Sequence, residues 1–518
     1  MTMHDPYQLI IPMTGLGQRF RDAGYLPLKP LIDTGFGSMI SGVLRNYPSI
    51  SSPICIISSN HEQREELRKE ILHHRPRARI FEIPGHKFGP SFAVKQIQGE
   101  LNLDELSVIN YCDFSGIWSE AKMVKKARSF DGLILVYSGF HPHMLRSTNF
   151  AYIKTDSSGM VLDIREKQAF GAEPNKEYAS SGTYVFRSGG VMLDAIDQQI
   201  SMGISYAQEF YTSLTYLPMI KSGKEIGFME IPFFFQWGTP ENLQDFKVWS
   251  LASQPRRIVP SIDSNNQMDN STTVILAAGV GSRLRSHGIV SKPLLPIFNK
   301  PLWSYSAQIG AKSRSKIIVA LEKDQNHLEK NNEFGYRVLA LKDSPKNALL
   351  TCDLALTTIT PENESIHVMA ADNIICGIRL ADISNKLKTC DVLVWVARDY
   401  LGAKSQPESF SWVSQDSNEK VLTLHLKSTP PHHAHLLIGN FSFRNKIILQ
   451  TLIQSALKNN SHNAELSFDL IIQEGLDKGL EIRTIDVGFF AAIGTEIELN
   501  IAEYYEHSLT RWNVIHEK

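Results

Sequence analysis

Two glycine-rich turns in this chain carry the residue types that bind polyphosphate. Each follows an apolar run, has the pattern Gly-x-Gly-x-Arg, and is followed about ten residues later by Lys-Pro-Leu. Such turns present backbone N–H groups to anions, and a nearby arginine and lysine favour a polyphosphate over a carboxylate. The sequence therefore predicts two nucleotide sites, at Gly15, Leu16, Gly17, Arg19 and Lys29, and at Gly279, Val280, Gly281, Arg283 and Lys292.

The two turns belong to a longer repeat, whose later blocks also match in order. The matched pairs are Asp113 and Asp372, Lys167 and Lys427, Gly182 and Gly439, and Gly238 and Gly494, all about 260 residues apart. Collinear matches at one long period indicate a duplicated domain rather than a solenoid. The stretch SQPRRIVPSIDSNNQMDNSTT has linker composition. We therefore expect domains at residues 1–254 and 272–518, joined by a linker at 255–271.

The elements that position these residues alternate between strands and helices. Short apolar runs such as LIIPM, PICIISS and GLILVYS in the first half have counterparts in VILAA, KIIVALE and DVLVWVA in the second. The pattern predicts an α/β fold of two tandem Rossmann-like domains, each a mostly parallel sheet with helices on both faces. Ligands of such sheets bind beyond the carboxyl ends of the strands, and Asp113 and Asp372 each follow a strand-like run.

Composition restricts the class of protein. The chain has 518 residues, 42% of them hydrophobic, and a formal net charge of −1, so nonspecific attraction to nucleic acid is not expected. No apolar run approaches the ~20 residues of a membrane span, and the start MTMHDPYQ lacks a signal-peptide pattern. The five cysteines form no Cys-x-x-Cys pair. We expect a cytoplasmic protein with reduced thiols; whether it forms a homo-oligomer stays open.

The full motif narrows the chemistry. The third glycine of the dinucleotide fingerprint is replaced by Phe20 and Leu284, and the Walker pattern is absent. Gly-x-Gly-x-Arg followed by Lys-Pro-Leu resembles the opening signature of the sugar-phosphate nucleotidyltransferases, the NDP-sugar pyrophosphorylase family. The resemblance continues through GHKFGPSFAV, which contains Gly89 and looks like the family's nucleobase loop, SSGTYVF, which contains Gly182, and WGTPENL. The segment YSGFHPHMLRSTNFAY resembles a subgroup linked to capsule or surface-polysaccharide synthesis.

The resemblance implies a reaction and a set of roles. A nucleoside triphosphate and a sugar 1-phosphate would give an NDP-sugar and pyrophosphate, an activity of the EC 2.7.7 type. Arg19, Lys29, Arg283 and Lys292 would hold the triphosphate, Asp113 and Asp372 would bind Mg²⁺, and Lys167 and Lys427 would meet the substrate phosphate. His141 and His143 are candidate substrate contacts or packed loop residues, and Gly182 is a further candidate substrate contact.

Two departures from the family pattern keep alternatives open. The second metal-binding aspartate of the family is replaced by Gln236 and Ala492, and the segment ALKDSPKNALL lacks the glycines of the predicted base loop. We expect the first half to be the catalytic one. A CTP-dependent cytidylyltransferase acting on phosphocholine-like or other small phosphorylated alcohols is an alternative. A second alternative is a non-catalytic nucleotide-binding regulator or scaffold.

Overall fold

A computed structural model describes residues 5–254, 269–279, 281–360, 364–398, 400–460 and 466–516. The chain forms two units, Met1–Lys247 with Ser508–Lys518, and Val248–His507. Most of the predicted linker, residues 255–268, lies outside the described residues.

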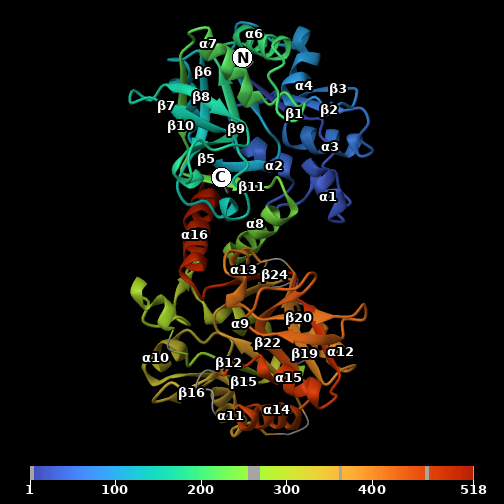
Figure 1. The fold of residues 1–518 in the computed structure, drawn as a ribbon, viewed down its shortest axis with the longest axis vertical. Coiled ribbons are helices and arrows are strands. Elements are labelled where there is room, and N and C mark those ends of the chain that lie inside the picture. Colours follow the sequence, from blue (N-terminus) through green and yellow to red (C-terminus); the bar gives the residue numbers. More distant parts are fainter. Residues whose placement is uncertain are drawn as a thin grey trace. The chain divides into compact units, whose positions relative to one another are not determined.

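The first unit is built on a nine-stranded sheet (Figure 1). Its strands are β1 (Gln8–Met13), β2 (Ile54–Ser58), β3 (Arg79–Ile83), β4 (Ser107–Asn110), β6 (Gly132–Tyr137), β7 (Tyr152–Thr155), β8 (Val161–Arg165), β9 (Tyr178–Phe186) and β10 (Ile226–Glu230). The main order is β10-β6-β9-β4-β1-β2-β3, in which only β9 runs antiparallel to its neighbours. A separate antiparallel pair joins β5 (Phe114–Ile117) to β11 (Phe233–Gln236).

Helices cover both faces of this sheet. Alternate residues of β1 enter two different apolar clusters: Leu9 and Ile11 enter one, and Ile10 enters the other. The first cluster contains side chains of α2 (Met39–Arg45), α3 (Arg64–His74) and α5 (Glu120–Ala127). The second contains side chains of α4 (Pro90–Gln96), α6 (Gly189–Ser201) and α7 (Tyr216–Lys221). The alternation of strand side chains thus gives one core on each side of the sheet.

The second unit repeats this architecture. Its sheet contains β12 (Asp269–Leu276), β15 (Ser313–Leu321), β16 (Arg337–Leu341), β17 (Ser365–Ala370), β19 (Val392–Ala397), β20 (Trp412–Gln415), β21 (Val421–His425), β22 (His435–Phe443) and β23 (Ile482–Asp486). The order β23-β19-β22-β17-β12-β15-β16 matches that of the first sheet strand for strand, with β22 as the antiparallel one. Two short antiparallel pairs are β18 (Asn373–Cys376) with β24 (Phe489–Ala492), and β13 (Pro296–Ile297) with β14 (Lys300–Pro301).

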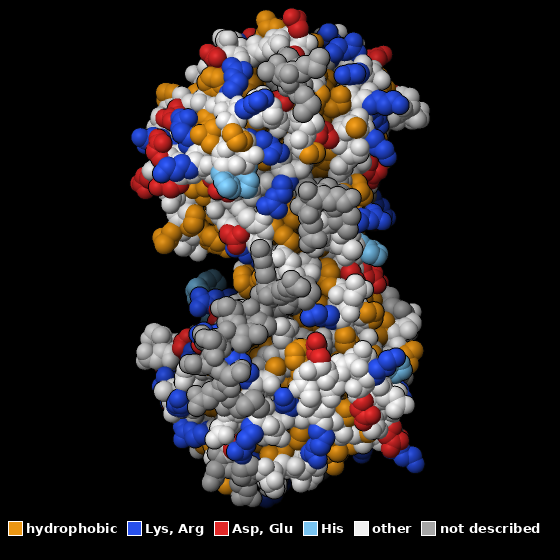
Figure 2. Space-filling view, turned by 180° about the vertical axis from the view of Figure 1, so that it is seen from behind, with side chains coloured by type: hydrophobic (Ala, Val, Ile, Leu, Met, Phe, Trp, Pro, Cys, Tyr) orange, Lys and Arg blue, Asp and Glu red, His pale blue; other side chains and the backbone are white. Residues whose placement is uncertain are grey.

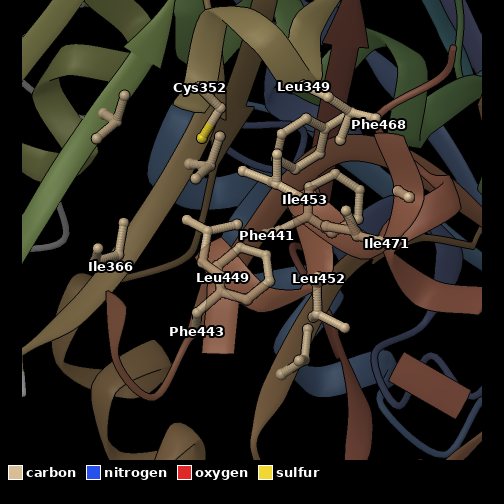
Figure 3. Packing of buried hydrophobic residues seen from close by; sticks show 14 of the residues in the cluster. Leu349, Cys352, Ile366, Phe441, Phe443, Leu449, Leu452, Ile453, Phe468 and Ile471 are labelled. Carbon is tan, nitrogen blue, oxygen red and sulfur yellow. The ribbon is translucent and has the colours of Figure 1, made fainter. Parts of the chain in front are cut away.

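One large core of the second unit packs three helices against the sheet. Leu349, Leu452 and Ile471 come from α11 (Ala348–Leu356), α14 (Lys446–Asn459) and α15 (Leu470–Asp477), and they surround Phe441 of β22 (Figure 3). Further helices of this half are α9 (Trp303–Ile309), α10 (Glu322–Lys330), α12 (Leu380–Leu387) and α13 (Leu401–Ser405). The predicted fold class, two tandem α/β domains with mostly parallel sheets, is confirmed.

The remaining elements connect or extend these layers. Helix α1 (Gln18–Asp22) follows the first glycine turn, while α8 (Pro240–Ser253) and α16 (Glu496–His516) each follow a Gly-Thr pair. Short 3₁₀ turns are η1 (Lys29–Leu31), η2 (Gln98–Glu100), η3 (Pro142–Leu145), η4 (Pro174–Lys176), η5 (Thr212–Thr215), η6 (Ser282–His287), η7 (Gly310–Lys312) and η8 (Pro407–Ser409).

The surface of each unit carries charged side chains of both signs, and the cysteines are not paired in disulfides. Lysine and arginine side chains alternate with acidic ones over the face of each unit in view (Figure 2). Among the helices in the described ranges, none has the length and hydropathy that crossing a bilayer requires. All five cysteines are free thiols, and four of them are buried.

Candidate active site

The glycine turn of the first unit folds directly onto Lys29. Gly15, Leu16 and Gly17 follow β1, and Gly17 takes a left-handed conformation with φ 64° before α1 begins. A Cβ atom at Gly17 would lie 3.0 Å from the Cβ of Lys29, so a side chain there would meet both strain and a close contact. The fully buried His61 donates from Nε2 to the carbonyl of Gly15 at 3.2 Å.

Lys29 in turn meets Asp113 beyond the carboxyl end of β4. Its Nζ lies 2.7 Å from Asp113 Oδ2 and 3.4 Å from the carbonyl oxygen of Gly238. A Cβ atom at Gly238 would lie 3.3 Å from both Asp113 Oδ2 and Gln236 Oε1. The end of β11 therefore places the amide oxygen of Gln236 and the carboxylate of Asp113 on the same side of Gly238. The side chains of Lys29 and Asp113 stay 19% and 28% exposed, so a ligand can reach them.

Lys167 contacts two tyrosines that also contact each other. It follows β8 with a positive φ of 57°, and its Nζ donates to Tyr211 Oη at 2.7 Å. The ring centroids of Tyr206 and Tyr211 lie 5.0 and 4.6 Å from Nζ. Burial, reinforced by Glu209, raises the pKa of Tyr211, whereas Arg19 acts in the opposite direction. The positive charges of Arg19 and Lys167 therefore both act on the phenol group of Tyr211.

Two further predicted glycines are sites of close packing. Gly89 caps α4 at φ 85°, and a Cβ there would lie 2.9 Å from the backbone nitrogen of Phe210. Gly182 has φ 94°, and a Cβ there would lie 2.9 Å from the ring of Phe114, next to Asp113. Both positions therefore need glycine for reasons of geometry, whatever ligand the neighbouring loops bind.

His141 and His143 lie in the interior of the first unit, 3% and 5% exposed. Their rings pack against Tyr137, and His143 also packs against Phe150 and Phe234. Burial lowers the pKa of His141 to about 4 and lowers that of His143 well below 6.5. The structure places these two predicted substrate contacts among aromatic rings of the core, whereas Lys29 and Asp113 are partly open to solvent.

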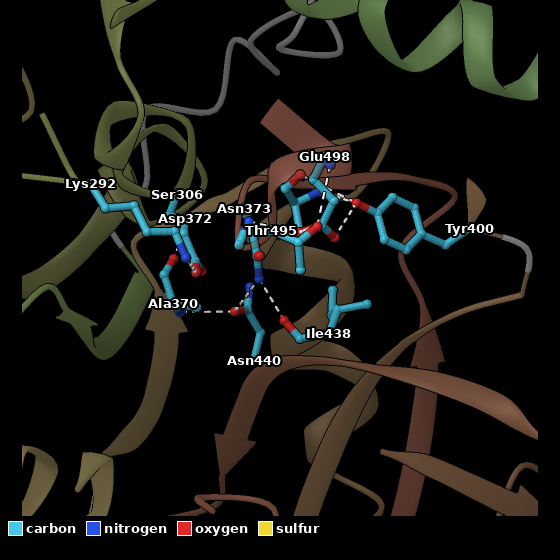
Figure 4. A network of polar contacts seen from close by, with 12 residues as sticks. Lys292, Ser306, Ala370, Asp372, Asn373, Tyr400, Ile438, Asn440, Thr495 and Glu498 are labelled. Carbon is cyan, nitrogen blue, oxygen red and sulfur yellow. Dashed lines mark hydrogen bonds and ion pairs between the residues drawn. The ribbon is translucent and has the colours of Figure 1, made fainter. Parts of the chain in front are cut away.

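The predicted residues of the second unit gather around one cavity of about 380 Å³. Gly281, Arg283, Lys292, Asp372 and Lys427 all line it. Lys292 forms an ion pair with Asp372 (Figure 4), as Lys29 does with Asp113. Gly279 precedes this group with open space where a Cβ would stand, and Val280 lies outside the described residues.

Backbone conformations repeat between the two sites as well. Gly17 and Gly281 share a positive φ, at 64° and 59°. Lys167 and Lys427 do so as well, at 57° and 40°, although neither is glycine. Left-handed backbone is costly for residues with a Cβ, so its recurrence at matched lysines supports a common geometry for both sites.

The cavity also contains two carboxylates that sequence reasoning missed. Burial raises the pKa of Asp469, while hydrogen bonds from Ser411 and Ser467 and the charge of Lys427 lower it. Glu498 is 2% exposed and accepts hydrogen bonds from Tyr400, Gly494 and Thr495 (Figure 4). The Thr-x-x-Glu spacing of Thr495 and Glu498 is a capping-box pattern, a signal present in the sequence. In the first unit, Tyr206 and Tyr211 were missed because a tyrosine carries no motif.

The sequence of the chain matches one known protein family. The sequence model of the family described as nucleotidyl transferase matches twice, at residues 9–203 and 272–492. The chain belongs to this family. The predicted resemblance and the tandem duplication are therefore confirmed, and the chain is assigned to the nucleotidyltransferases. A search of curated proteins finds no match.

Solved structures of the family align with about half of the chain. A nucleoside-diphosphate-sugar pyrophosphorylase from Vibrio cholerae RC9 is 17% identical, covers 46% of this chain and 99% of its own, and gives a TM-score of 0.39. An inositol-1-phosphate CTP transferase from T. maritima is 10% identical, covers 46% of this chain and 92% of its own, and gives a TM-score of 0.36.

Proposed function

We propose that this nucleotidyltransferase joins a nucleoside triphosphate to a sugar 1-phosphate, with release of pyrophosphate, and that the first unit performs the transfer. The observation that carries the proposal is the ion pair of Lys29 and Asp113, located where the Gly17 turn and the loop after β11 meet. We propose that each half, residues 1–254 and 272–518, corresponds to one family domain. A role in surface or capsular polysaccharide synthesis and a cytoplasmic location stay predictions.

The chemistry needs no nucleophile from the protein. An oxygen of the substrate phosphate attacks the α-phosphorus in line, and the bond from that phosphorus to the β-phosphate oxygen breaks as pyrophosphate leaves. Catalysis then depends on positioning and on neutralising negative charge. Arg19 and Lys29 would hold the triphosphate on the Gly17 turn, and Lys167, oriented by Tyr211, would hold the substrate phosphate.

The donor set around Asp113 fits a magnesium ion. Mg²⁺ prefers oxygen ligands, keeps several waters, and often takes only one or two carboxylates together with substrate phosphates. In the described part of the chain, no three His, Cys, Asp or Glu side chains cluster as a metal site. The carboxylate of Asp113 and the amide oxygen of Gln236 would therefore be its protein ligands, with water and nucleotide completing the shell. When bound, the ion would neutralise charge on the phosphates.

Pyrophosphate release from a panel of substrates tests the proposal. ATP, CTP, GTP, UTP and dTTP are each combined with a set of sugar 1-phosphates and with phosphocholine, with and without Mg²⁺. We expect release with at least one sugar 1-phosphate. Release with CTP and phosphocholine alone would favour the cytidylyltransferase alternative, and silence across the panel would contradict transfer altogether.

A matched pair of variants tests which unit transfers. Asp113→Asn keeps the size of the side chain but removes its charge, so we expect at least a hundredfold loss of turnover, the order of effect seen when a charge-stabilising group is removed. Asp372→Asn makes the same change in the second unit and should cause a loss at least ten times smaller. The reverse ranking would show that the second unit is the transferase.

A further inference from the structure

The cavity of the second unit differs from the first site at the position where a metal would bind. There β24 pairs Ala492 with Asn373, as β11 pairs Gln236 with Phe114. The amide oxygen of Gln236 thus has no counterpart at the matched position, because Ala492 offers only a methyl group there. Asp372 is left as the carboxylate at this end, in its ion pair with Lys292.

The nearby carboxylate of Glu498 does not replace the missing oxygen. Its Oε2 accepts hydrogen bonds from the backbone of Gly494 at 2.7 Å and of Thr495 at 2.9 Å, and from Thr495 Oγ1 at 3.1 Å. Its Oε1 accepts from Tyr400 Oη at 2.6 Å. The carboxylate is therefore used to cap the start of α16, and coordinating a cation would require giving up these bonds.

The same cavity is also lined by groups that suit a phosphorylated, hydroxyl-rich ligand. Lys427 supplies a cation, and Asp469 supplies a carboxylate whose charge interacts with it. Ser411 lies between them, since it bonds Asp469 and accepts from the backbone nitrogen of Lys427 at 3.4 Å. An ammonium group binds phosphate, while a carboxylate accepts hydrogen bonds from sugar hydroxyls.

The lining of the cavity contains no residue from the predicted base-contacting segment 340–350 among the residues the structure describes. Within that segment, Ser344 donates to the carbonyl of Ala278 at 2.7 Å, beside the glycine turn. Asn347 caps α11 by accepting from the backbone nitrogen of Leu350. Within the described residues, the cavity lining therefore includes the glycine turn, Lys427 and Asp469 but nothing from this segment.

We propose that the cavity of the second unit is a binding site for a sugar phosphate group that it does not transfer. The group is held by Arg283, Lys292 and Lys427 through its phosphate and by Asp469 through its hydroxyls. This inference rests on the proposed function of the first unit, since the ligand is of the same chemical class. Two sources share this chemistry: a free sugar 1-phosphate, and the sugar–diphosphate part of the NDP-sugar product.

Calorimetric titration of the full chain tests the binding. The probes are hexose 1-phosphates, the matching NDP-hexoses and inorganic phosphate. In the Asp113→Asn background, we expect Asp469→Asn and Lys427→Met each to weaken binding of one hexose phosphate equivalent at least tenfold. Lys167→Met should weaken a different equivalent. Glu333→Gln, at an exposed carboxylate of the second unit, is the matched control, and circular dichroism confirms that each variant is folded.

Each outcome decides the proposal. Unchanged binding in both Asp469→Asn and Lys427→Met overturns it, and so does inorganic phosphate binding as tightly as a hexose phosphate. Tighter binding of the NDP-hexose than of the hexose phosphate identifies the product as the source, and the opposite order identifies the free sugar phosphate. Pyrophosphate release by Asp113→Asn/Lys167→Met above one tenth of the wild-type rate also overturns it. If wild type transfers nothing, the proposed function fails, yet the same titrations in the wild-type background still test the cavity.

Discussion

The two units place the same cations on the same backbone but differ in the groups that accompany them. Around Lys29 and Asp113, Gln236 adds an oxygen and two tyrosines flank Lys167. Around Lys292 and Asp372, the corresponding strand ends in Ala492, and Lys427 faces a carboxylate. Both copies have thus kept the glycine-turn geometry that suits phosphate. They differ in the side chains around that turn, which lie outside the shared motif.

The largest expected difference concerns the lysines of the two Lys-Pro-Leu segments. Lys29→Met removes the cation next to Asp113, and we expect kcat to fall about 10³-fold, at the upper end of the losses seen when one electrostatic stabiliser is removed. Lys292→Met is the matched change in the second unit and should have a much smaller effect. Steady-state pyrophosphate release measures both, and equal losses would mean that both copies transfer.

A buried histidine distinguishes one strand of the second unit from its counterpart in the first. His367 of β17 is fully buried and occupies the position that Val108 has in β4. Burial lowers its pKa from 6.5 to about 4. Between these values the unfolded chain takes up a proton that the folded chain does not, so the free energy of unfolding falls as pH drops below 6.5. At 1.36 kcal/mol per pH unit, the full loss is about 3 kcal/mol near pH 4.

The substitution His367→Val introduces the residue that the first unit has at the matched position, Val108. It should remove the loss of unfolding free energy that protonation of His367 causes below pH 6.5. Denaturant titrations at pH 7 and pH 4.5 measure the effect in wild type and variant. His327→Gln, at an exposed histidine of the same unit, is the control. An identical pH dependence in His367→Val and wild type would contradict the assignment.

The N-termini of α4 and α11 provide a third contrast. Gly89→Ala places a Cβ at φ 85° and 2.9 Å from the nitrogen of Phe210, so we expect a destabilisation of about 2 kcal/mol. Asn347 caps the corresponding helix through its side chain, and Asn347→Ala should lower stability by about 1 kcal/mol. Chemical denaturation compares the two, and a Gly89→Ala chain as stable as wild type would refute the packing argument.

The smallest predicted effect isolates one hydroxyl. Tyr211→Phe removes the hydrogen bond to Lys167 but keeps the ring, and we expect KM for the phosphorylated substrate to rise about tenfold, the lower end for a bond to a charged group. Tyr206→Phe keeps the ring of Tyr206 next to Lys167 and does not touch the hydrogen bond to Tyr211, so we expect a smaller rise in KM. If kcat falls while KM stays constant, Tyr211 acts on the transition state rather than on positioning.

The architecture could be predicted from the sequence for two reasons. The hydrophobic periodicity that distinguishes a strand from a helix is visible within a short stretch of sequence. In addition, the two halves repeat the same order of elements, so each half supports the assignment of the other. The nearness of each glycine turn to Asp113 or Asp372 follows from neighbouring parallel strands whose carboxyl ends meet at one edge of the sheet. The ion pairs of Lys29 and Lys292 with these aspartates were not predicted. Tyr211 and Asp469 could not be predicted in the same way, because they come from segments whose distance from the motif depends on tertiary packing. The sequence left two roles open for His141, a substrate contact or a packed loop residue, because the burial of a loop histidine depends on tertiary packing.

The left-handed backbone of Lys167 and Lys427 has a consequence for protein engineering. Glycine adopts this conformation without strain, whereas a residue with a Cβ loses about 1–2 kcal/mol there. A directed-evolution screen that rewards heat tolerance alone should therefore enrich Lys167→Gly and Lys427→Gly. Thermostabilised libraries of this enzyme need a parallel assay for ligand capture, because their easiest gains coincide with the ammonium groups that would recognise phosphate.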